Sequence, residues 1–222
     1  MKADSYPITM TTFPDPQASA PQAPAPQWIG APPAEAAPLL RALTAWDEAS
    51  ANHSLRVGSA TSEFAQALGL TSDERSTLTL AAYLHDIGKL HTPRCILTKD
   101  GPLSCEEYRQ IQRHAADGAA IVQKTDLPES LIEIIHHHHE WWDGTGYPEG
   151  VAGTEIPLAS RIIGIVDAWD AISARRSYHR KKTEFLALSE IRKGAGSQFD
   201  PDLSHAFIDH AMQRLASNRR CA

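Results

Sequence analysis

The sequence predicts an all-α fold, and two features of its patterning support that prediction. From about Pro38 onward, apolar residues recur at steps of three and four, the spacing that places them on one face of an α-helix. Alternation of β-branched and polar residues, the usual pattern of a half-buried strand, is nearly absent. We therefore expect one helical domain over residues 39–222, a length within the normal range for a single domain.

The first 38 residues have a different composition and are predicted to form a disordered tail. Residues 1–38 contain nine of the fifteen prolines, many alanines and four charged residues. Such a segment has too few large apolar side chains to build a core, and it favours extended polyproline II structure. The predicted organisation is thus a Pro/Ala-rich tail, 1–38, followed by the helical domain.

The first half of the domain contains three periodic segments with recognisable ends. The segment 39–70 stops at Gly69, because glycine is favoured where a helix terminates. The segment 71–90 opens with Thr71 three residues before Glu74, the spacing of a capping box. The segment 104–125 repeats that spacing with Ser104 and Glu107, so it is also predicted to begin as a capped helix.

Three further helical segments complete the predicted domain. The segment 126–142 begins with Asp126 and an early proline, contains the four-histidine run 136–139, and breaks at the glycine-rich turn that follows. The segments 156–176 and 200–217 repeat the apolar periodicity of a helix packed on a core.

Composition excludes several classes of function. No apolar run approaches the roughly 18–20 residues that cross a bilayer, and the amino terminus lacks a secretion-signal pattern. The net charge of −6 argues against a broad basic face for long nucleic acids, but it allows a small phosphate ligand. The three cysteines form no CxxC pair, which favours a reduced, cytoplasmic protein without zinc held by thiolates.

The histidines give the first indication of a metal site. The chain has eleven, and eight of them lie between positions 53 and 139. Imidazole and carboxylate ligands together suit iron, manganese, cobalt, nickel or zinc. Histidine in excess in a cysteine-poor chain is therefore a hint of a site built from nitrogen and oxygen ligands.

Two positions carry polar groups inside apolar segments. His85 and Asp86 come at the end of an apolar helix, and Asp167 follows the apolar run 162–166. Burying such a group without a partner costs several kcal/mol, so each needs a counter-charge, a hydrogen bond or a metal ion. Taken alone, the His85–Asp86 pair is better explained as an ordinary hydrogen bond at a helix end.

Similar residues recur on other predicted helices, at His53, at His114 and in the run 136–139. Each one alone is more often a satisfied histidine or a solvated group than a ligand. Together they could converge from five helices on divalent cations. Composition by itself leaves that convergence open.

The order of these residues resembles a known family. His53, the His85–Asp86 pair and Asp167 resemble the His…His-Asp…Asp signature of the HD superfamily of metal-dependent phosphohydrolases. The stretches HDIGKLHTP, HHEWWDGTGYP and GSQFDP resemble its HD-GYP branch, the cyclic di-GMP phosphodiesterases of bacterial signalling. The resemblance spans about Trp46 to Pro201 and implies an HD-domain helical bundle with a GYP loop.

The resemblance implies two divalent metal ions, iron or manganese first, with cobalt, nickel or zinc as alternatives. The implied ligands of one ion are His53, His85, Asp86 and Asp167, and those of its neighbour are His114, His138 and His139, with Asp86 bridging both. The last two histidines of the run are chosen because the family's pair directly precedes the glutamate, here Glu140.

The resemblance also implies the chemistry. A hydroxide that bridges the two ions would attack phosphorus, with Asp86 and Lys89 as the catalytic residues. Lys89, Tyr147 and Arg176 occupy positions that contact the nucleotide in the family. Glu140 and Asp143 would orient ligands rather than act as a general base.

Some positions depart from the family pattern. Ala49 stands where some members have a glutamate that supports a third metal, so the resemblance implies two ions. Within the family the dinuclear form is associated with linear pGpG, which is therefore the expected product, and further cleavage to GMP is left open. Trp141 replaces an arginine, and the family's RPYR reads RSYH here, ending at His179. These changes concern substrate preference more than hydrolysis.

The predicted function is a metal-dependent cyclic di-GMP phosphodiesterase. One alternative is an HD phosphohydrolase for another cyclic dinucleotide or for a nucleotide monoester; the GYP loop and Arg176 argue against the monoester. A second is a degenerate domain that senses cyclic dinucleotides or docks on diguanylate cyclase (GGDEF) domains. Seven filled ligand positions favour the enzyme. A homodimer stays open, and neither a membrane nor long nucleic acid is an expected partner.

Overall fold

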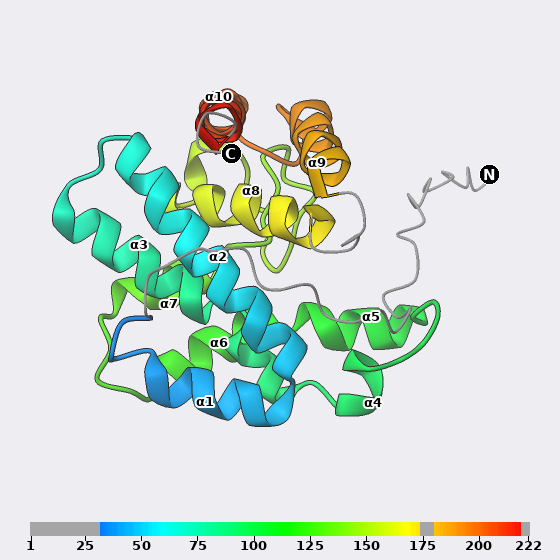
Figure 1. Cartoon of the computed structure of the whole chain (residues 1–222). Coiled ribbons are helices and arrows are strands. Elements are labelled where there is room, and N and C mark those ends of the chain that lie inside the picture. The colour runs from blue at the N-terminus through cyan, green and yellow to red at the C-terminus, as the bar shows by residue number, and fades with distance from the viewer. Residues whose placement is uncertain (1–31, 174–179, 219–222) are drawn as a thin grey trace.

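The protein is a bundle of helices, as the sequence predicts. The computed structural model describes residues 32–173 and 180–218, and it contains helices of both α and 3-10 type (Figure 1). Within these residues the only β-pairing is an isolated bridge between Ala195 and Phe199. Arg176, predicted to contact the nucleotide, lies outside the described residues. None of the described helices combines the length and the apolar character needed to cross a membrane.

The first predicted helical segment is in fact two helices, α1 (Ala37–Trp46) and α2 (Glu48–Ala67). Asp47 between them has an extended backbone, with φ −149° and ψ 101°, and its side chain accepts a hydrogen bond from the Ser50 amide at 3.1 Å. The aspartate therefore caps α2, and the chain changes direction at that residue. The apolar periodicity continues across the break, so it does not reveal it.

Both predicted capping boxes are confirmed. Thr71 and Glu74 cap α3 (Ser72–Leu84), and Ser104 and Glu107 cap α5 (Cys105–Gln112). The short helices η1 (Ile87–His91) and α4 (Arg94–Leu97) connect these two elements. Helix α6 (His114–Val122) follows α5 after Arg113, so the predicted segment 104–125 is divided.

The segment with the histidine run forms a shorter helix than predicted. Helix α7 (Ser130–His136) ends at the first histidine, and His137 leaves helical geometry with φ −103° and ψ 10°. The chain continues through the GYP loop, the part of the connection 137–152 that contains Gly146, Tyr147 and Pro148. It then passes through η2 (Gly153–Glu155) into α8 (Leu158–Ser173). His138 and His139 therefore lie on a turn, which lets both consecutive side chains reach the same site.

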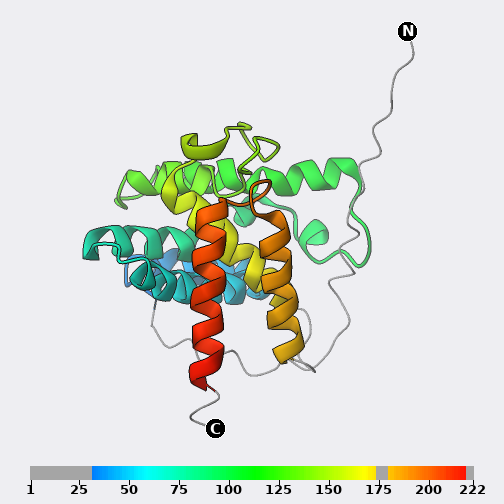
Figure 2. The same ribbon diagram turned by 90° about the horizontal axis from the view of Figure 1, so that it is seen from above.

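The carboxy-terminal part contains a helix that the sequence analysis did not identify. Helix α9 (Arg180–Gly194) precedes α10 (Pro201–Asn218), and the two lie side by side and antiparallel (Figure 2). Both helices are described, but the side chains of residues 180–183, at the start of α9, are not.

The core lies between α2, α3, α7 and α8. Its largest fully buried side chains include Phe64, Leu84, Ile135, Ile162 and Ile163. Burying an aliphatic or aromatic side chain of this size contributes about 1.5–3 kcal/mol, so these contacts fix the helices that carry the polar residues.

Gly88, in the HDIGK motif, lets η1 pack directly on α6. A Cβ atom at this position would come within 2.0 Å of the His114 carbonyl oxygen and 2.5 Å of the Gly118 amide nitrogen. Any side chain would therefore push the two elements apart. The glycine thus determines how closely Asp86, at the start of η1, approaches His114, at the start of α6.

We expect Gly88→Ala to lower the free energy of unfolding by about 3 kcal/mol, because the new methyl group meets backbone atoms that have little freedom to move. Gly101→Ala is the control, since Gly101 has φ +106° and no neighbour within 4 Å of an added Cβ. It should cost only the backbone strain, about 1–2 kcal/mol. Urea unfolding of both variants measures the difference, and equal losses would contradict the packing argument.

Candidate metal centre

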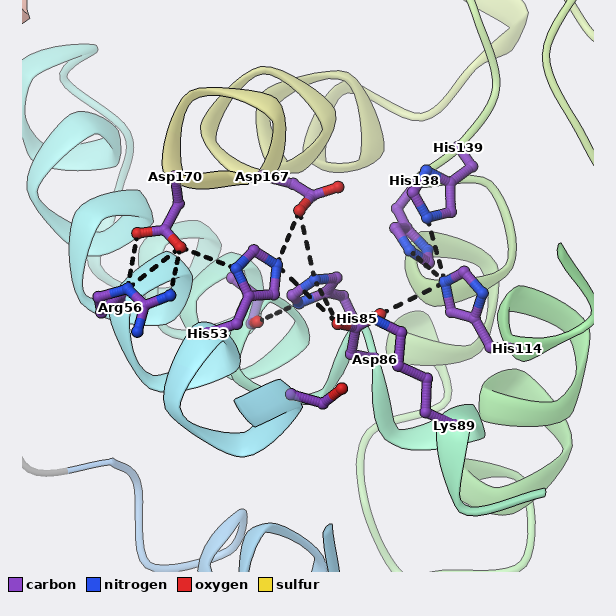
Figure 3. Close-up of polar contacts among 12 residues, drawn as sticks. His53, Arg56, His85, Asp86, Lys89, His114, His138, His139, Asp167 and Asp170 are labelled. Atoms are coloured by element: carbon purple, nitrogen blue, oxygen red, sulfur yellow. Dashed lines mark hydrogen bonds and ion pairs between the residues drawn. The ribbon is translucent and has the colours of Figure 1, made fainter. Parts of the chain in front are cut away.

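Histidine and aspartate side chains from five parts of the fold meet in the middle of the bundle (Figure 3). His53 comes from α2, His85 and Asp86 from the end of α3, His114 from the start of α6, and Asp167 from α8. His138 and His139 come from the turn after α7. The structure thus brings together all seven residues that the sequence analysis named as metal ligands.

The first of two clusters consists of His53, His85, Asp86 and Asp167. The Nε2 atom of His53 lies 2.8 Å from Asp167 Oδ1 and 3.9 Å from Asp86 Oδ2. The Nε2 atom of His85 lies 3.6 Å from Asp86 Oδ2 and 3.9 Å from Asp167 Oδ1. Two imidazoles and two carboxylates therefore face one small volume.

The second cluster consists of His114, His138 and His139. The Nε2 atom of His114 lies 3.2 Å from that of His138 and 3.1 Å from that of His139. Ligands bound at about 2.0–2.1 Å to one ion are separated by about 3 Å or slightly more. The spacing of these three nitrogens therefore fits a single divalent cation.

Asp86 lies between the clusters and turns one oxygen to each. Its Oδ2 atom faces His53 and His85, and its Oδ1 atom is 3.4 Å from His114 Nε2. The residue is 2% exposed, so an ionised carboxylate here requires positive charge nearby. This is the position that a bridging ligand between two ions would occupy.

The hydrogen bonds of the rings decide which nitrogen is free to bind a metal. His85, His114 and His138 each direct Nδ1 at a backbone carbonyl three residues earlier, at 2.8, 2.6 and 2.6 Å. A carbonyl only accepts, so each Nδ1 carries the proton and, in the neutral ring, each Nε2 presents a lone pair.

The lone pairs on these Nε2 atoms have no hydrogen-bond donor opposite them. The Nε2 atoms of His114 and His138 face each other at 3.2 Å, and the buried Nε2 of His85 has no hydrogen-bond partner. Converging lone pairs are unfavourable unless a cation lies between them. The donor set therefore fits divalent ions on chemical grounds, independently of any family pattern.

The two clusters differ in their electrostatics. Burial lowers the pKa of His138 well below its ordinary value, and together with neighbouring His114 it lowers that of His139 to about 3. Burial would also lower the pKa of His53, but hydrogen bonds to Asp167 and Asp170 raise it to about 10. Burial would raise the pKa of Asp86, but Lys89 and the surrounding histidines hold it well below its usual value. The first cluster thus attracts positive charge more strongly.

Lys89 places an ammonium group directly against the central carboxylate. Its Nζ atom donates to Asp86 Oδ2 at 2.6 Å, and its side chain is 21% exposed. The HDIGK spacing produces this contact, because η1 begins right after Asp86 and places Lys89 one turn away. The lysine is both tied to the central carboxylate and open toward the outside of the bundle.

The GYP loop covers the second cluster. The ring of Tyr147 stacks on that of His139, with centroids 4.8 Å apart and an interplanar angle of 30°. Gly146 makes this possible, because a Cβ there would lie 2.2 Å from the Trp141 amide nitrogen. Glu140 accepts hydrogen bonds from the amides of Glu149 and Gly150, at 2.6 and 3.0 Å. Its carboxylate therefore holds the loop, whereas the sequence analysis expected it to orient a ligand.

The GSQFDP segment anchors the other side of the loop. The amides of Trp142 and Asp143 donate to the carbonyls of Gln198 and Ser197, at 3.2 and 2.9 Å. Asp143 also accepts from the Thr145 amide and hydroxyl, which closes the turn without contacting a proposed ligand. The turn between α9 and α10 therefore fixes where the GYP loop begins.

The other histidines of the run lie outside both clusters, as predicted. His136 Nε2 is 3.1 Å from Glu149 Oε1, and His137 Nδ1 donates to the Glu133 carbonyl. Two residues beside the first cluster, Asp170 and Arg56, were not predicted from the sequence. Each lies three positions after a predicted ligand on a helix, so the i,i+3 spacing was the available signal.

Comparisons with known proteins agree with this arrangement. The family model described as HD domain matches residues 39–203. The chain belongs to the HD domain family. Its histidine pair and GYP loop are those of the HD-GYP branch, so the resemblance noted in the sequence is confirmed.

Curated relatives include a cyclic di-GMP phosphodiesterase from Thermotoga maritima, 35% identical over 158 residues, which are 70% of this chain and 43% of the relative. A 3'3'-cGAMP-specific phosphodiesterase 3 from Vibrio cholerae is 40% identical over 153 residues, 69% of this chain and 33% of the relative. The chain thus spans less than half the length of either relative.

Among solved structures, the cyclic GMP-AMP phosphodiesterase V-cGAP3 of V. cholerae superposes with a TM-score of 0.61 at 22% identity, covering 84% of this chain and 49% of that one. The HD domain of the Listeria monocytogenes phosphodiesterase PgpH superposes with a TM-score of 0.59 at 20% identity, covering 81% of this chain and 96% of that one. These likenesses confirm the helical HD fold.

The buried histidines predict how the stability of the metal-free protein depends on pH. Below about pH 6.5 the unfolded chain takes up protons that folded His138 and His139 reject, so stability falls toward acid by up to ~1.4 kcal/mol per pH unit for each histidine. The raised pKa of His53 has the opposite effect. Its contribution to the free energy of unfolding is fully present below pH 6.5 and is lost as pH rises toward about 10.

Urea unfolding of EDTA-treated protein between pH 5 and 9 should therefore show a maximum near pH 6.5. His139→Gln should make the acid limb shallower, whereas His205→Gln, at an exposed position on α10, should leave it unchanged. A stability that increases steadily from pH 6.5 to pH 5 would contradict the assignment of neutral buried histidines.

Proposed function

We propose that this chain hydrolyses cyclic di-GMP to linear pGpG with two divalent metal ions, iron or manganese. The observation that supports the proposal most directly is the position of Asp86, whose two oxygens face two separate sets of histidine nitrogens. A dinuclear centre needs a ligand of that kind, and the converging lone pairs of both clusters are suited to cations. Cleavage to pGpG and onward cleavage to GMP are distinguished by the product analysis below.

When bound, two such ions lower the pKa of water and neutralise charge on a phosphate group. The first ion would be held by His53, His85, Asp86 and Asp167, and the second by Asp86, His114, His138 and His139. Asp86 would keep the ions next to each other. Two ions rather than three are favoured because Glu48, the acidic residue nearest the position of the family's additional glutamate, is exposed at the start of α2.

The other proposed residues act on the substrate. Lys89 is 21% exposed and contacts Asp86, so its ammonium group is placed to attract a phosphate oxygen beside the metal centre. Tyr147 stacks on His139 and would offer a bound nucleotide an aromatic ring and a hydroxyl group beside the second cluster. Arg176 keeps its proposed role in nucleotide binding through the family resemblance alone. The mechanism requires no separate general base.

A different cyclic dinucleotide is a second candidate substrate. The V. cholerae relatives named as 3'3'-cGAMP-specific phosphodiesterases are 34–40% identical to this chain, and the T. maritima cyclic di-GMP phosphodiesterase is 35% identical. Overall sequence identity therefore does not show whether the second base of the substrate is guanine, as in cyclic di-GMP, or adenine, as in 3'3'-cGAMP. A direct comparison of the two substrates does.

We also propose a cytoplasmic location, because the three cysteines form no CxxC pair and favour a reducing compartment. Docking on GGDEF domains and homodimer formation are proposed from the family resemblance.

The central test is a product analysis. Protein purified anaerobically and supplied with Fe²⁺ or Mn²⁺ should convert cyclic di-GMP to pGpG, as followed by chromatography, with 3'3'-cGAMP assayed in parallel. Asp86→Ala should reduce turnover at least ~10³-fold, because both clusters lose a ligand. Asp117→Ala is the control: Asp117 lies on the neighbouring α6, and among the charged groups of the described residues it pairs with His91 and Arg113 rather than with a proposed ligand.

Faster hydrolysis of 3'3'-cGAMP would favour the second candidate. Absence of hydrolysis with either metal would refute the enzyme proposal. If signalling output in cells then persisted unchanged in Asp86→Ala, the sensor or docking function would be supported instead.

Lys89→Met distinguishes two roles of the lysine, stabilising charge on the substrate phosphate and holding Asp86 in place for the metal ions. Loss of the ammonium group should lower kcat/KM for cyclic di-GMP by about 10²–10³-fold, because charge on the phosphate is no longer balanced. The content of bound metal, measured by elemental analysis, should stay close to that of the unmodified protein. A parallel loss of metal would show instead that Lys89 serves to keep Asp86 in place.

A further inference from the structure

We propose that Asp170, held by Arg56, is a positioning residue that fixes His53 for metal binding in the first cluster. The inference rests on the metal centre of the proposed function, which it deepens. Neither residue belongs to the set of proposed ligands, and Figure 3 shows both of them on the far side of His53 from the second cluster.

The contacts form a chain of short hydrogen bonds. Arg56 donates to Asp170 through Nε, at 2.9 Å to Oδ1, and through Nη2, at 2.8 Å to Oδ2. Asp170 Oδ2 lies 2.8 Å from His53 Nδ1. The Asp170 side chain is 5% exposed, so the forked pairing with arginine satisfies a charge that would otherwise be costly to bury. The pairing also prevents the carboxylate from rotating away from His53.

His53 needs such a partner because its surroundings differ from those of the other histidines. His85, His114 and His138 each donate from Nδ1 to a backbone carbonyl three residues earlier. Those three rings are therefore oriented by the main chain of their own segment. His53 lies within the long helix α2, where the carbonyls are engaged in the helix, and its Nδ1 atom meets the Asp170 carboxylate instead.

The orientation of His53 matters because the tautomer with its proton on Nε2 would make two ligand atoms unavailable to a metal ion. The Nε2 atom of His53 lies 2.8 Å from Asp167 Oδ1. If the single proton of a neutral ring were on Nε2, it would be donated to Asp167, and neither atom would be available to a cation. Asp170 can only accept, so it favours the proton on Nδ1 and leaves the Nε2 lone pair facing Asp86 and Asp167.

The effect should be confined to one of the two subsites. The Asp170 side chain forms no hydrogen bond or ion pair with His114, His138 or His139, which come from α6 and from the turn after α7. Its hydrogen bonds go to His53 and Arg56 on α2. Mutation of the residue that accepts a hydrogen bond from a metal-ligating histidine typically weakens metal affinity 10–100-fold. The expected signature of Asp170 is therefore a selective weakening of the subsite that contains His53.

The test compares Mn²⁺ binding by the whole chain and by Asp170→Ala, using calorimetric titration. The unmodified protein should bind two ions. Asp170→Ala should bind one of them at least 10-fold more weakly and the other with unchanged affinity. In Zn²⁺-loaded protein, the ¹⁵N shifts of His53 should change from metal-bound toward free imidazole, whereas those of His114 should remain metal-bound.

Asp200→Ala is the matched control. Asp200 is also buried and paired with an arginine, since Arg161 Nη1 donates to its Oδ2 at 2.6 Å. Its other hydrogen bonds go to the first turn of α10 rather than to a proposed ligand. It should lower stability without changing either binding step, so that loss of a buried Arg–Asp pair is distinguished from loss of His53 orientation.

Arg56→Ala is the second variant, because a 22% exposed side chain is easier to remove than Asp170 if Asp170→Ala fails to fold. It should weaken the same subsite, since Asp170 is then free to turn away. Two unchanged binding steps in either folded variant, or equal weakening of both steps, would overturn the inference. Failure of the unmodified protein to bind metal would instead refute the proposed function.

Discussion

The structure depends on one constraint: a carboxylate, Asp86, is buried at the centre of a helical bundle and must be surrounded by positive or hydrogen-bonding groups. Helix α3 ends at Leu84 with His85 as its C-cap, so the backbone can turn and point the carboxylate of Asp86 inward. Gly88 then allows η1 to approach α6, which brings His114 near the second oxygen of Asp86. The helices are fixed by aliphatic packing, but their ends are arranged around this charge.

Much of this arrangement could be predicted from the sequence, because local signals coincide with the tertiary structure. The capping boxes at Thr71 and Ser104 mark two helix starts, and they depend only on residues within one turn. The family motif similarly identifies the seven residues that meet in the two clusters. The breaks at Asp47 and after His136 escaped prediction, because apolar periodicity continues across the first and the histidine run gives no stop signal before the second. Asp170 escaped because its role depends on His53, 117 positions earlier.

The ligand histidines are oriented in two different ways. Main-chain carbonyls receive the Nδ1 protons of His85 in the first cluster and of His114 and His138 in the second. His53, also in the first cluster, is in mid-helix and is oriented by a side chain from α8. The first cluster contains two carboxylates and the second is made of imidazoles, so the two proposed ions would have unlike surroundings within one shared site.

The attachment of the GYP loop also has a consequence for how the sequence can vary. The loop is tied to residues 197 and 198 through amide and carbonyl groups, which every residue there would supply. Substitutions at Ser197 or Gln198 can therefore accumulate without moving Tyr147, whereas insertion of a single residue between α9 and α10 would shift both carbonyls. Across species, the length of this turn should therefore vary less than the side chains at positions 197 and 198.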